Sequence, residues 1–239
     1  MGKIFVVGIG PGNTEHMTRK AKEVLDHSDC ILGYKTYIDL IRKDYSTKKL
    51  ISFPMRSEVE RCNLTLQKAK DYKQVSLISS GDAGVYGMAG ILLEIANEEI
   101  IEVVPGMTAI QGAAASLGAP IMHDYVSISL SDLLTKWSLI EKRLTLASEG
   151  DFVTCLYNPK SKTRTTQIKK ARDIFMKNGG KDKIVGIVKN AKRKNEAIYL
   201  TTVENMLDYP IDMTTLVIIG NQSTYIKNNQ MITKRGYDV

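Results

Sequence analysis

Cysteine is scarce in this sequence. Its three cysteines, Cys30, Cys62 and Cys155, are far apart, and no two of them form a C-x-x-C pair. An odd number of scattered cysteines does not suggest a disulfide framework, and without paired spacing no zinc site is expected. The sequence therefore predicts a protein of a reducing compartment with no metal site of its own.

Long apolar runs are also lacking. The apolar run that opens the sequence ends at Gly8, which is too short for a signal peptide, and no run approaches the roughly 20 residues of a membrane helix. Gly2 does not open a myristoylation motif, because position 6 is Val6 rather than Ser or Thr. We expect a cytoplasmic protein without a membrane partner.

Aromatic residues make up only 7% of the 239 residues, whereas Lys and Arg number 33 against 26 Asp and Glu, for a formal net charge of +7. A positive field favours anionic partners, although the charge alone does not choose among them. Nucleic-acid surfaces often interleave basic runs with aromatic residues, and this sequence has no such run. We expect no nucleic-acid partner, and we interpret most of the lysines as a solvated surface.

What the sequence does contain is an alternation of short apolar strands and amphipathic helices. We expect strands at 3–8, 29–33, 50–53, 74–80, 99–106, 151–159, 183–191, 196–202 and 214–221. We expect helices after Thr18 as N-cap, at 34–43, 57–72 and 163–180, and from near Val85 and Thr108. The pattern resets after residues 116–132. It predicts an α/β fold of two domains, residues 1–118 with a mostly parallel sheet and 119–239 with a more mixed one, and a boundary near 117–123.

Ligands of open parallel sheets bind beyond the carboxyl ends of the strands, and this rule selects five loops. They are residues 8–13, 79–87, 105–109, 156–163 and 189–193.

The first loop, GIGPGN, is not a dinucleotide fingerprint, because Asn13 stands where a third glycine is needed and Pro11 removes a backbone N–H. It is equally compatible with a tight turn and with a ligand site. In SSGDAGVYG, Asp82 lies among glycines, where it could bind a hydroxyl or ammonium group. The alternative is that Asp82 only caps the following helix.

A nucleophile paired with a base does not stand out. His123 beside Asp124, at the expected domain junction, is the one histidine with a functional hypothesis. Methyl transfer needs positioning and desolvation more than a catalytic array, so the sequence is compatible with that chemistry.

The loops, in their order, resemble the tetrapyrrole methylase family over essentially the whole chain. The residues that carry the resemblance are GIGPG (8–12), GDAGVYGMA (81–89), VVPGMTA (103–109), GAPIMHDYVSISLSDLLTKW (118–137), LYNPKSKTR (156–164) and VIIGNQST (217–224). The stretch that contains SLSDLLT resembles the branch that methylates precorrin-3B or cobalt-factor III at C17. Two positions depart from the pattern: Lys136 and Ala83 stand where relatives often carry proline, and Lys136 leaves the conformation of its loop in doubt.

The resemblance implies two α/β domains with S-adenosylmethionine (SAM) in the cleft between them, and a homodimer. It implies C17 methylation of an anionic tetrapyrrole in cobalamin biosynthesis, coupled to ring contraction in which the C20 bridge carbon is extruded as an acetyl group. Cobalt would be present only as part of the substrate. The sequence does not decide between a metal-free and a cobalt-containing substrate, although a chain without an extra domain favours the latter.

The resemblance also implies residue roles. SAM contacts are expected in the first domain at Gly10, Pro11, Gly81, Asp82, Val85, Tyr86, Thr108 and Ala109, and in the second at Leu156, Tyr157, Asn190, Ala191 and Thr215. Candidates for macrocycle chemistry are His123, Asp124, Ser131 and Asp132, although Asp132 is also interpreted as the N-cap of a helix. Lys35, Lys160 and Arg164 could pair with substrate carboxylates.

Three other functions stay open. The nearest is another corrin methylase of this fold, the C20 or C11 enzyme, against which the SLSDLLT stretch argues. The others are an rRNA ribose methyltransferase, which the net charge permits, and a binding protein without catalysis.

Overall fold

The computed structural model describes residues 2–238, and the chain divides into two compact units, residues 1–109 and 110–239. The division lies earlier than the expected boundary after residue 118. The reason is helix α5 (Ala109–Leu117), whose Ile110, Ala113 and Leu117 belong to a buried cluster with strands of the second unit. Within residues 2–238, no helix combines the length and the apolar character that crossing a bilayer requires.

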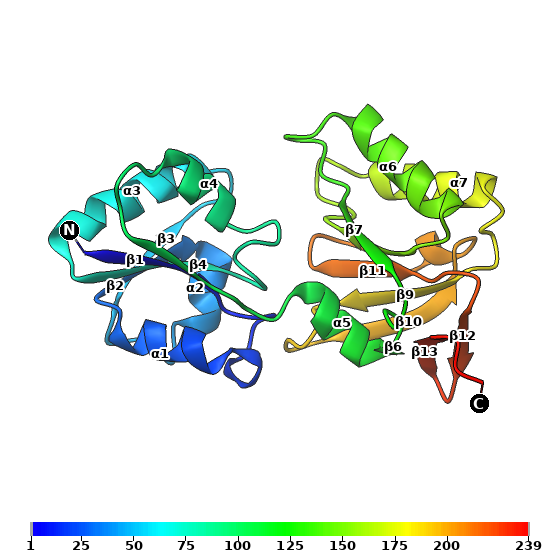
Figure 1. Cartoon of the computed structure of the whole chain (residues 1–239), viewed down its shortest axis with the longest axis horizontal. Helices are drawn as coiled ribbons and strands as arrows, with labels where there is room; N and C mark the ends of the chain where they lie inside the picture. The colour runs from blue at the N-terminus through cyan, green and yellow to red at the C-terminus, as the bar shows by residue number, and fades with distance from the viewer. Residues whose placement is uncertain (1, 239) are drawn as a thin grey trace. The chain divides into compact units, whose positions relative to one another are not determined.

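The first unit is a five-stranded parallel sheet in the order β3-β2-β4-β1-β5, with helices on both faces (Figure 1). Its strands are β1 (Lys3–Gly8), β2 (Cys30–Tyr34), β3 (Lys49–Phe53), β4 (Gln74–Ser79) and β5 (Ile101–Val104). Its helices are α1 (Arg19–His27), α2 (Lys35–Ile41), α3 (Glu58–Asp71) and α4 (Ala89–Ile95), with a 3-10 turn η1 (Thr14–His16).

Alternation along the strands sends side chains to two cores. Ile4 and Val6 of β1 pack with α3 and α4, whereas Phe5 and Val7 pack with α1 and α2. A fully buried strand covered on both faces reads as a continuous apolar run, which is why residues 3–8 were recognisable as a strand. Thr18 is the N-cap of α1, as predicted: its Oγ1 accepts from the Ala21 N–H at 3.1 Å.

The second unit has a five-stranded mixed sheet in the order β10-β9-β11-β8-β7, in which β7 and β8 are parallel and the other pairs antiparallel. Its elements are β6 (Gly118–Ala119), β7 (Tyr125–Ser129), α6 (Trp137–Glu149), β8 (Val153–Tyr157), α7 (Gln167–Lys177), β9 (Ile184–Lys189), β10 (Ala197–Thr202), η2 (Met206–Asp208), β11 (Thr215–Ile219), β12 (Thr224–Lys227) and β13 (Gln230–Thr233). Helix α5 packs on one face and α6 and α7 on the other, and β12, β13 and β6 form a small separate sheet. The predicted α/β class, with a parallel first sheet and a mixed second one, is confirmed.

One expected helix start is wrong. A helix was expected from near Val85, but α4 begins at Ala89. Tyr86 has a left-handed φ of 54°, and the Ala89 N–H reaches back to the Ala83 carbonyl at 2.9 Å, so residues 81–88 form a compact loop instead. The second expected start, near Thr108, agrees with α5.

Candidate active site

Three glycine loops pack backbone against backbone at the carboxyl ends of neighbouring strands β4, β1 and β5. The Gly10 N–H donates to the Gly81 carbonyl at 3.1 Å, and the Gly81 N–H donates to the Gly10 carbonyl at 2.7 Å. A Cβ on Gly106 would lie 2.2 Å from the Gly81 oxygen and 2.6 Å from the Gly8 oxygen. Only glycine permits this approach, so these glycines hold three loops together at the edge where ligands of parallel sheets bind.

Asp82 joins two of these loops. Its Oδ1 accepts from the Gly84 N–H at 2.7 Å, and its Oδ2 accepts from the Gly106 N–H at 2.9 Å. It does not cap α4, which begins seven residues later at Ala89, so the cap interpretation is wrong. Each carboxylate oxygen keeps a second lone pair, and the half-buried side chain could therefore also accept from a hydroxyl or ammonium group.

The other predicted cofactor residues of the first unit lie along the same loops. Pro11 is buried, whereas Val85 and Tyr86 are exposed on the 81–88 loop. Thr108 is half-buried and directly precedes α5, which begins at Ala109. The structure thus places these candidates on the loops that Asp82 joins, with Val85 and Tyr86 exposed.

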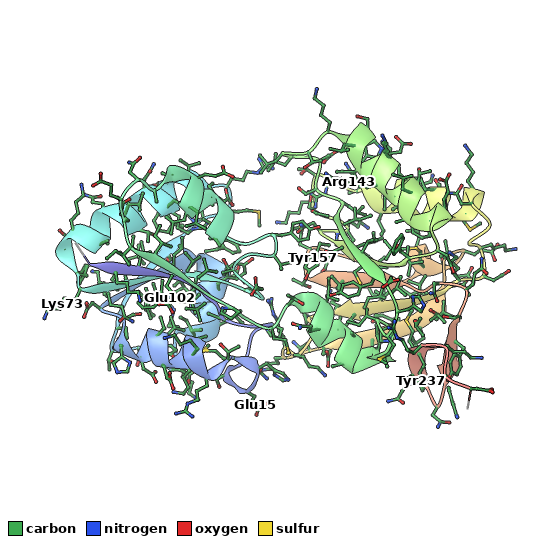
Figure 2. All side chains as sticks on the ribbon, in the orientation of Figure 1. Glu15, Lys73, Glu102, Arg143, Tyr157 and Tyr237 are labelled. Atoms are coloured by element: carbon green, nitrogen blue, oxygen red, sulfur yellow. The ribbon has the colours of Figure 1, made fainter. Side chains whose placement is uncertain are left out.

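In the second unit, four predicted residues gather at one edge of the mixed sheet. Tyr157 ends β8 (labelled in Figure 2), and Asn190 and Ala191 follow β9. Thr215 begins the antiparallel strand β11 and is paired with Lys189, so it lies at the same edge. The Asn190 N–H donates to the Thr214 carbonyl at 3.0 Å.

Leu156 differs from these four residues. Its side chain is fully buried in the core with α6 and α7. Any contact of Leu156 with a ligand is therefore restricted to its backbone.

Asp212 organises the turn before Thr215. Its Oδ1 accepts from the Thr214 N–H and Oγ1 at 2.8 and 2.7 Å and from the Thr215 Oγ1 at 3.2 Å, while Oδ2 pairs with Lys189 Nζ at 2.6 Å. Partial burial raises the pKa of Asp212, but the hydrogen bonds from Lys189 and Thr214 outweigh it and lower the pKa to about 2. Sequence reasoning missed this residue, because an isolated Asp before a strand carries no signal of its partners.

The four catalytic candidates lie at opposite ends of β7. His123 and Asp124 precede the strand, at the edge where Tyr125 pairs with Val153. Ser131 and Asp132 follow it, at the edge where Ser129 pairs with Tyr157. At about 3.3 Å per residue, the two pairs are on the order of 20 Å apart and cannot serve one reacting atom. The edge that holds Tyr157 favours Ser131 and Asp132.

His123 and Asp132 each make a hydrogen bond to a nearby group. His123 Nδ1 accepts from the Asp124 N–H at 2.8 Å, and both side chains are exposed. Asp132 accepts from Gln167 Nε2 at 2.8 Å. It is not an N-cap, because α6 begins at Trp137 with Lys136 in the cap position, so that interpretation is also wrong.

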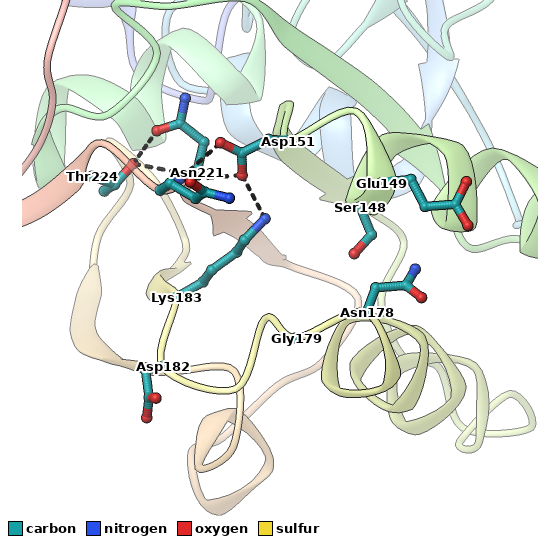
Figure 3. Close-up of a pocket in the computed structure, with 10 residues that line it drawn as sticks. Ser148, Glu149, Asp151, Asn178, Gly179, Asp182, Lys183, Asn221 and Thr224 are labelled. Carbon is teal, nitrogen blue, oxygen red and sulfur yellow. Dashed lines mark hydrogen bonds and ion pairs between the residues drawn. The ribbon is translucent and has the colours of Figure 1, made fainter.

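A pocket of about 540 Å³ lies at the other edge of the second sheet, before the starts of β8 and β9 (Figure 3). Asp151 and Lys183 form an ion pair of 2.7 Å in its wall. Ser148 Oγ and Asn178 Nδ2 are buried there without a hydrogen-bond partner among residues 2–238. Because this edge is opposite to Tyr157, Asn190 and Thr215, the pocket is separate from the candidate cofactor residues of this unit.

Among the described residues, no three His, Cys, Asp or Glu side chains gather in a way that could hold a metal ion. The three cysteines are buried and unbonded.

Comparison with known proteins decides the family. The sequence pattern described as Tetrapyrrole (Corrin/Porphyrin) Methylases matches residues 3–207. The chain belongs to the tetrapyrrole methylase family. Within this family, it is 47% identical over 238 residues to a protein of Salmonella typhimurium named probable cobalt-factor III C(17)-methyltransferase, covering 98% of this chain and 99% of the relative.

A second tetrapyrrole methylase relative is longer. The chain is 47% identical over 244 residues to the cobalt-factor III methyltransferase of Priestia megaterium, covering 99% of this chain but only 45% of that relative, so it spans less than half of that protein.

Solved structures of tetrapyrrole methylases agree with the fold. The crystal structure of the methyltransferase CobJ superposes with a TM-score of 0.91 at 31% identity, covering 98% of this chain and 100% of that one. The uroporphyrin-III C-methyltransferase of Thermus thermophilus, complexed with S-adenosylhomocysteine, superposes with a TM-score of 0.71 at 20% identity, covering 92% and 97%. The latter likeness concerns the fold alone.

Proposed function

We propose that this protein methylates C17 of cobalt-factor III with SAM as the methyl donor, in the ring-contracting step of cobalamin biosynthesis. The observation that carries the proposal is the 47% identity to the Salmonella typhimurium relative over nearly the full length of both chains. The names of both relatives specify cobalt-factor III, which favours the cobalt-containing substrate over precorrin-3B.

The first unit fits a SAM site. Its interlocked glycine loops offer low-bulk backbone beside the Asp82 carboxylate, at the edge where α/β sheets bind ligands. When bound, SAM supplies a methyl group on a cationic sulfur, which becomes a neutral thioether as the C–S bond breaks and a C–C bond forms. Asp82 accepts hydrogen bonds from the ammonium or ribose hydroxyls, and loop N–H groups hold the carboxylate. Positioning is the main contribution of these residues, because the methyl group is already activated.

The macrocycle chemistry is assigned to the carboxyl edge of β7. Ser131 and Asp132 lie there, at the same edge as Tyr157. A carboxylate at this edge accepts or returns the proton that ring contraction displaces. His123 and Asp124 have no part in this role, because they lie at the other end of β7.

The test is an anaerobic incubation of the protein with SAM and cobalt-factor III, with precorrin-3B in parallel, followed by absorbance and mass spectrometry. We expect a product one methyl group heavier, with the spectrum of a contracted ring, from cobalt-factor III. Product from precorrin-3B alone would overturn the choice of substrate. Absence of product from both, with SAM still bound, would remove the C17 assignment.

The proposed homodimer is tested separately. Light scattering should give a mass twice that of the 26.6 kDa chain at micromolar concentration. A monomer mass would remove the dimer and leave the methyltransferase proposal in place.

A further inference from the structure

Two leucines after β7 are unusually exposed. Leu134 has 96% of its surface accessible, the largest fraction among the large apolar side chains of the described residues, and its neighbour Leu133 has 68%. Both belong to the segment between β7 and α6, here called the leucine loop (residues 130–136), which leads beyond the end of β7 in Figure 1. Adjacent apolar side chains held in water favour a partner that covers them.

The loop is fastened on its first half. The Ser131 N–H donates to Ser129 Oγ at 3.2 Å, and Asn158 Nδ2 donates to the same oxygen at 2.9 Å. Asp132 accepts from Gln167 Nε2 at 2.8 Å. These bonds connect the loop to the segment after β8 and to the start of α7. They fix the position of the residues that directly precede the two leucines.

The segment to which the loop is tied is strongly basic. Residues 157–170 contain five Lys or Arg and no Asp or Glu. The exposed Lys136 lies within the loop. Trp137 directly follows the loop, and Lys170 Nζ lies 5.0 Å from the centre of its ring. The apolar pair therefore follows the carboxylate of Asp132 and is otherwise bordered by basic residues.

We infer that Leu133 and Leu134 contact the apolar face of the tetrapyrrole substrate, while Lys160 and Lys162 pair with its peripheral carboxylates. This inference rests on the proposed function and names the residues that recognise its substrate. A flat apolar ring with carboxylates around its rim complements an apolar pair with a basic border.

A second copy of the chain fits this surface less well. A two-fold contact places the same patch of both copies together, so residues 157–170 of one copy would approach those of the other. Juxtaposed like charges oppose such a contact. The positive border thus favours an anionic occupant over a subunit.

The test compares the parent with the double variant Leu133→Ser/Leu134→Ser. The control is Leu146→Ser, which removes a leucine of 56% exposure from α6 in the same unit. We expect the double variant to raise KM for cobalt-factor III at least tenfold and to weaken its binding in an absorbance titration, with SAM affinity and melting temperature unchanged. The control should match the parent, and Lys160→Glu/Lys162→Glu should also raise KM.

The outcomes separate the inference from the proposed function. If the parent converts cobalt-factor III and the double variant has the same KM, the inference is overturned and the function stands. If the parent converts nothing, the proposed function falls, and equal macrocycle binding by parent and double variant overturns the inference as well. A double variant that becomes monomeric where the parent is dimeric assigns the leucines to a subunit contact, which also overturns the inference.

Discussion

At the scale of single residues, Asp82 is the most constrained candidate, because each of its oxygens accepts a backbone N–H from a different loop segment. In Asp82→Asn, one of those N–H groups would face an amide donor instead of an oxygen. The change also weakens the hydrogen bond that Asp82 is proposed to accept from SAM. Hydrogen bonds to charged groups contribute about 1.5–3 kcal/mol each, so we expect SAM affinity to fall at least tenfold in calorimetry. Asp173→Asn, at an exposed carboxylate of α7, is the control. A SAM Kd within twofold of the parent would show that the carboxylate charge is dispensable.

The lowered pKa of Asp212 predicts how the free energy of unfolding depends on pH. Its pKa is about 2 in the folded chain, below the ordinary value of about 3.9 for an unfolded Asp. The unfolded state therefore binds the proton more readily, and the stabilisation by Asp212 is complete above about pH 5 and lost as the pH falls toward 2. We expect the parent to exceed Asp212→Asn in free energy of unfolding at pH 7, and the difference to narrow from pH 5 to pH 3 in urea titrations. A difference that stays constant across this range would contradict the lowered pKa.

At the scale of elements, the three loops that contain Gly10, Gly81 and Gly106 pack together through close backbone contacts. A methyl group on Gly106 would meet two carbonyl oxygens, whereas on Gly90 of α4 it would meet nothing within 4 Å. We expect Gly106→Ala to cost about 1–3 kcal/mol of stability and to weaken SAM binding. Gly90→Ala should stabilise by about 0.5–1 kcal/mol, because alanine is the better helix former. Equal melting temperatures for the two variants would mean that the loops separate easily.

Strand β7 provides the second prediction at this scale, because it places the catalytic candidates at opposite edges. Asp132→Asn should lower kcat at least tenfold without changing SAM affinity, since it removes the carboxylate at the Tyr157 edge. His123→Ala should keep kcat within twofold of the parent. The reverse result, a large loss with His123→Ala alone, would assign the chemistry to the start of the strand.

The elements also show what the sequence could predict. Strand β1, which is buried on both faces, is an almost continuous apolar run, and β4 contains apolar residues around the buried Ser76; the positions of both agree with the prediction. Strand β7 is an edge strand with mostly accessible residues, so it was missed. A helix was expected directly after Asp132, but α6 begins only at Trp137. The loop candidates were found because glycine-rich segments follow apolar strands. Their mutual contacts, and the partner of Asp132, depend on residues distant in sequence, which local patterns do not encode.

At the scale of the whole molecule, charge links the sequence to the proposed substrate. The formal net charge is +7, and five of the basic residues lie in the segment fastened to the leucine loop. Such a field raises the local concentration of an anionic ligand, and dissolved salt weakens it. SAM itself carries a net charge of about +1, since its carboxylate offsets one of its two positive charges, so screening should not weaken its binding.

The two substrates should therefore respond differently to ionic strength. Raising the salt from about 0.05 M to about 0.5 M shortens the screening length from over 10 Å to a few ångströms, and we expect KM for cobalt-factor III to rise several-fold. KM for SAM should stay within twofold over the same range, and it serves as the internal control. The measurement is repeated with sodium chloride and potassium acetate, because a screening effect depends on ionic strength and little on the ion. A KM for cobalt-factor III that is independent of salt would mean that the macrocycle is held by its apolar face alone, and that the basic segment has another partner.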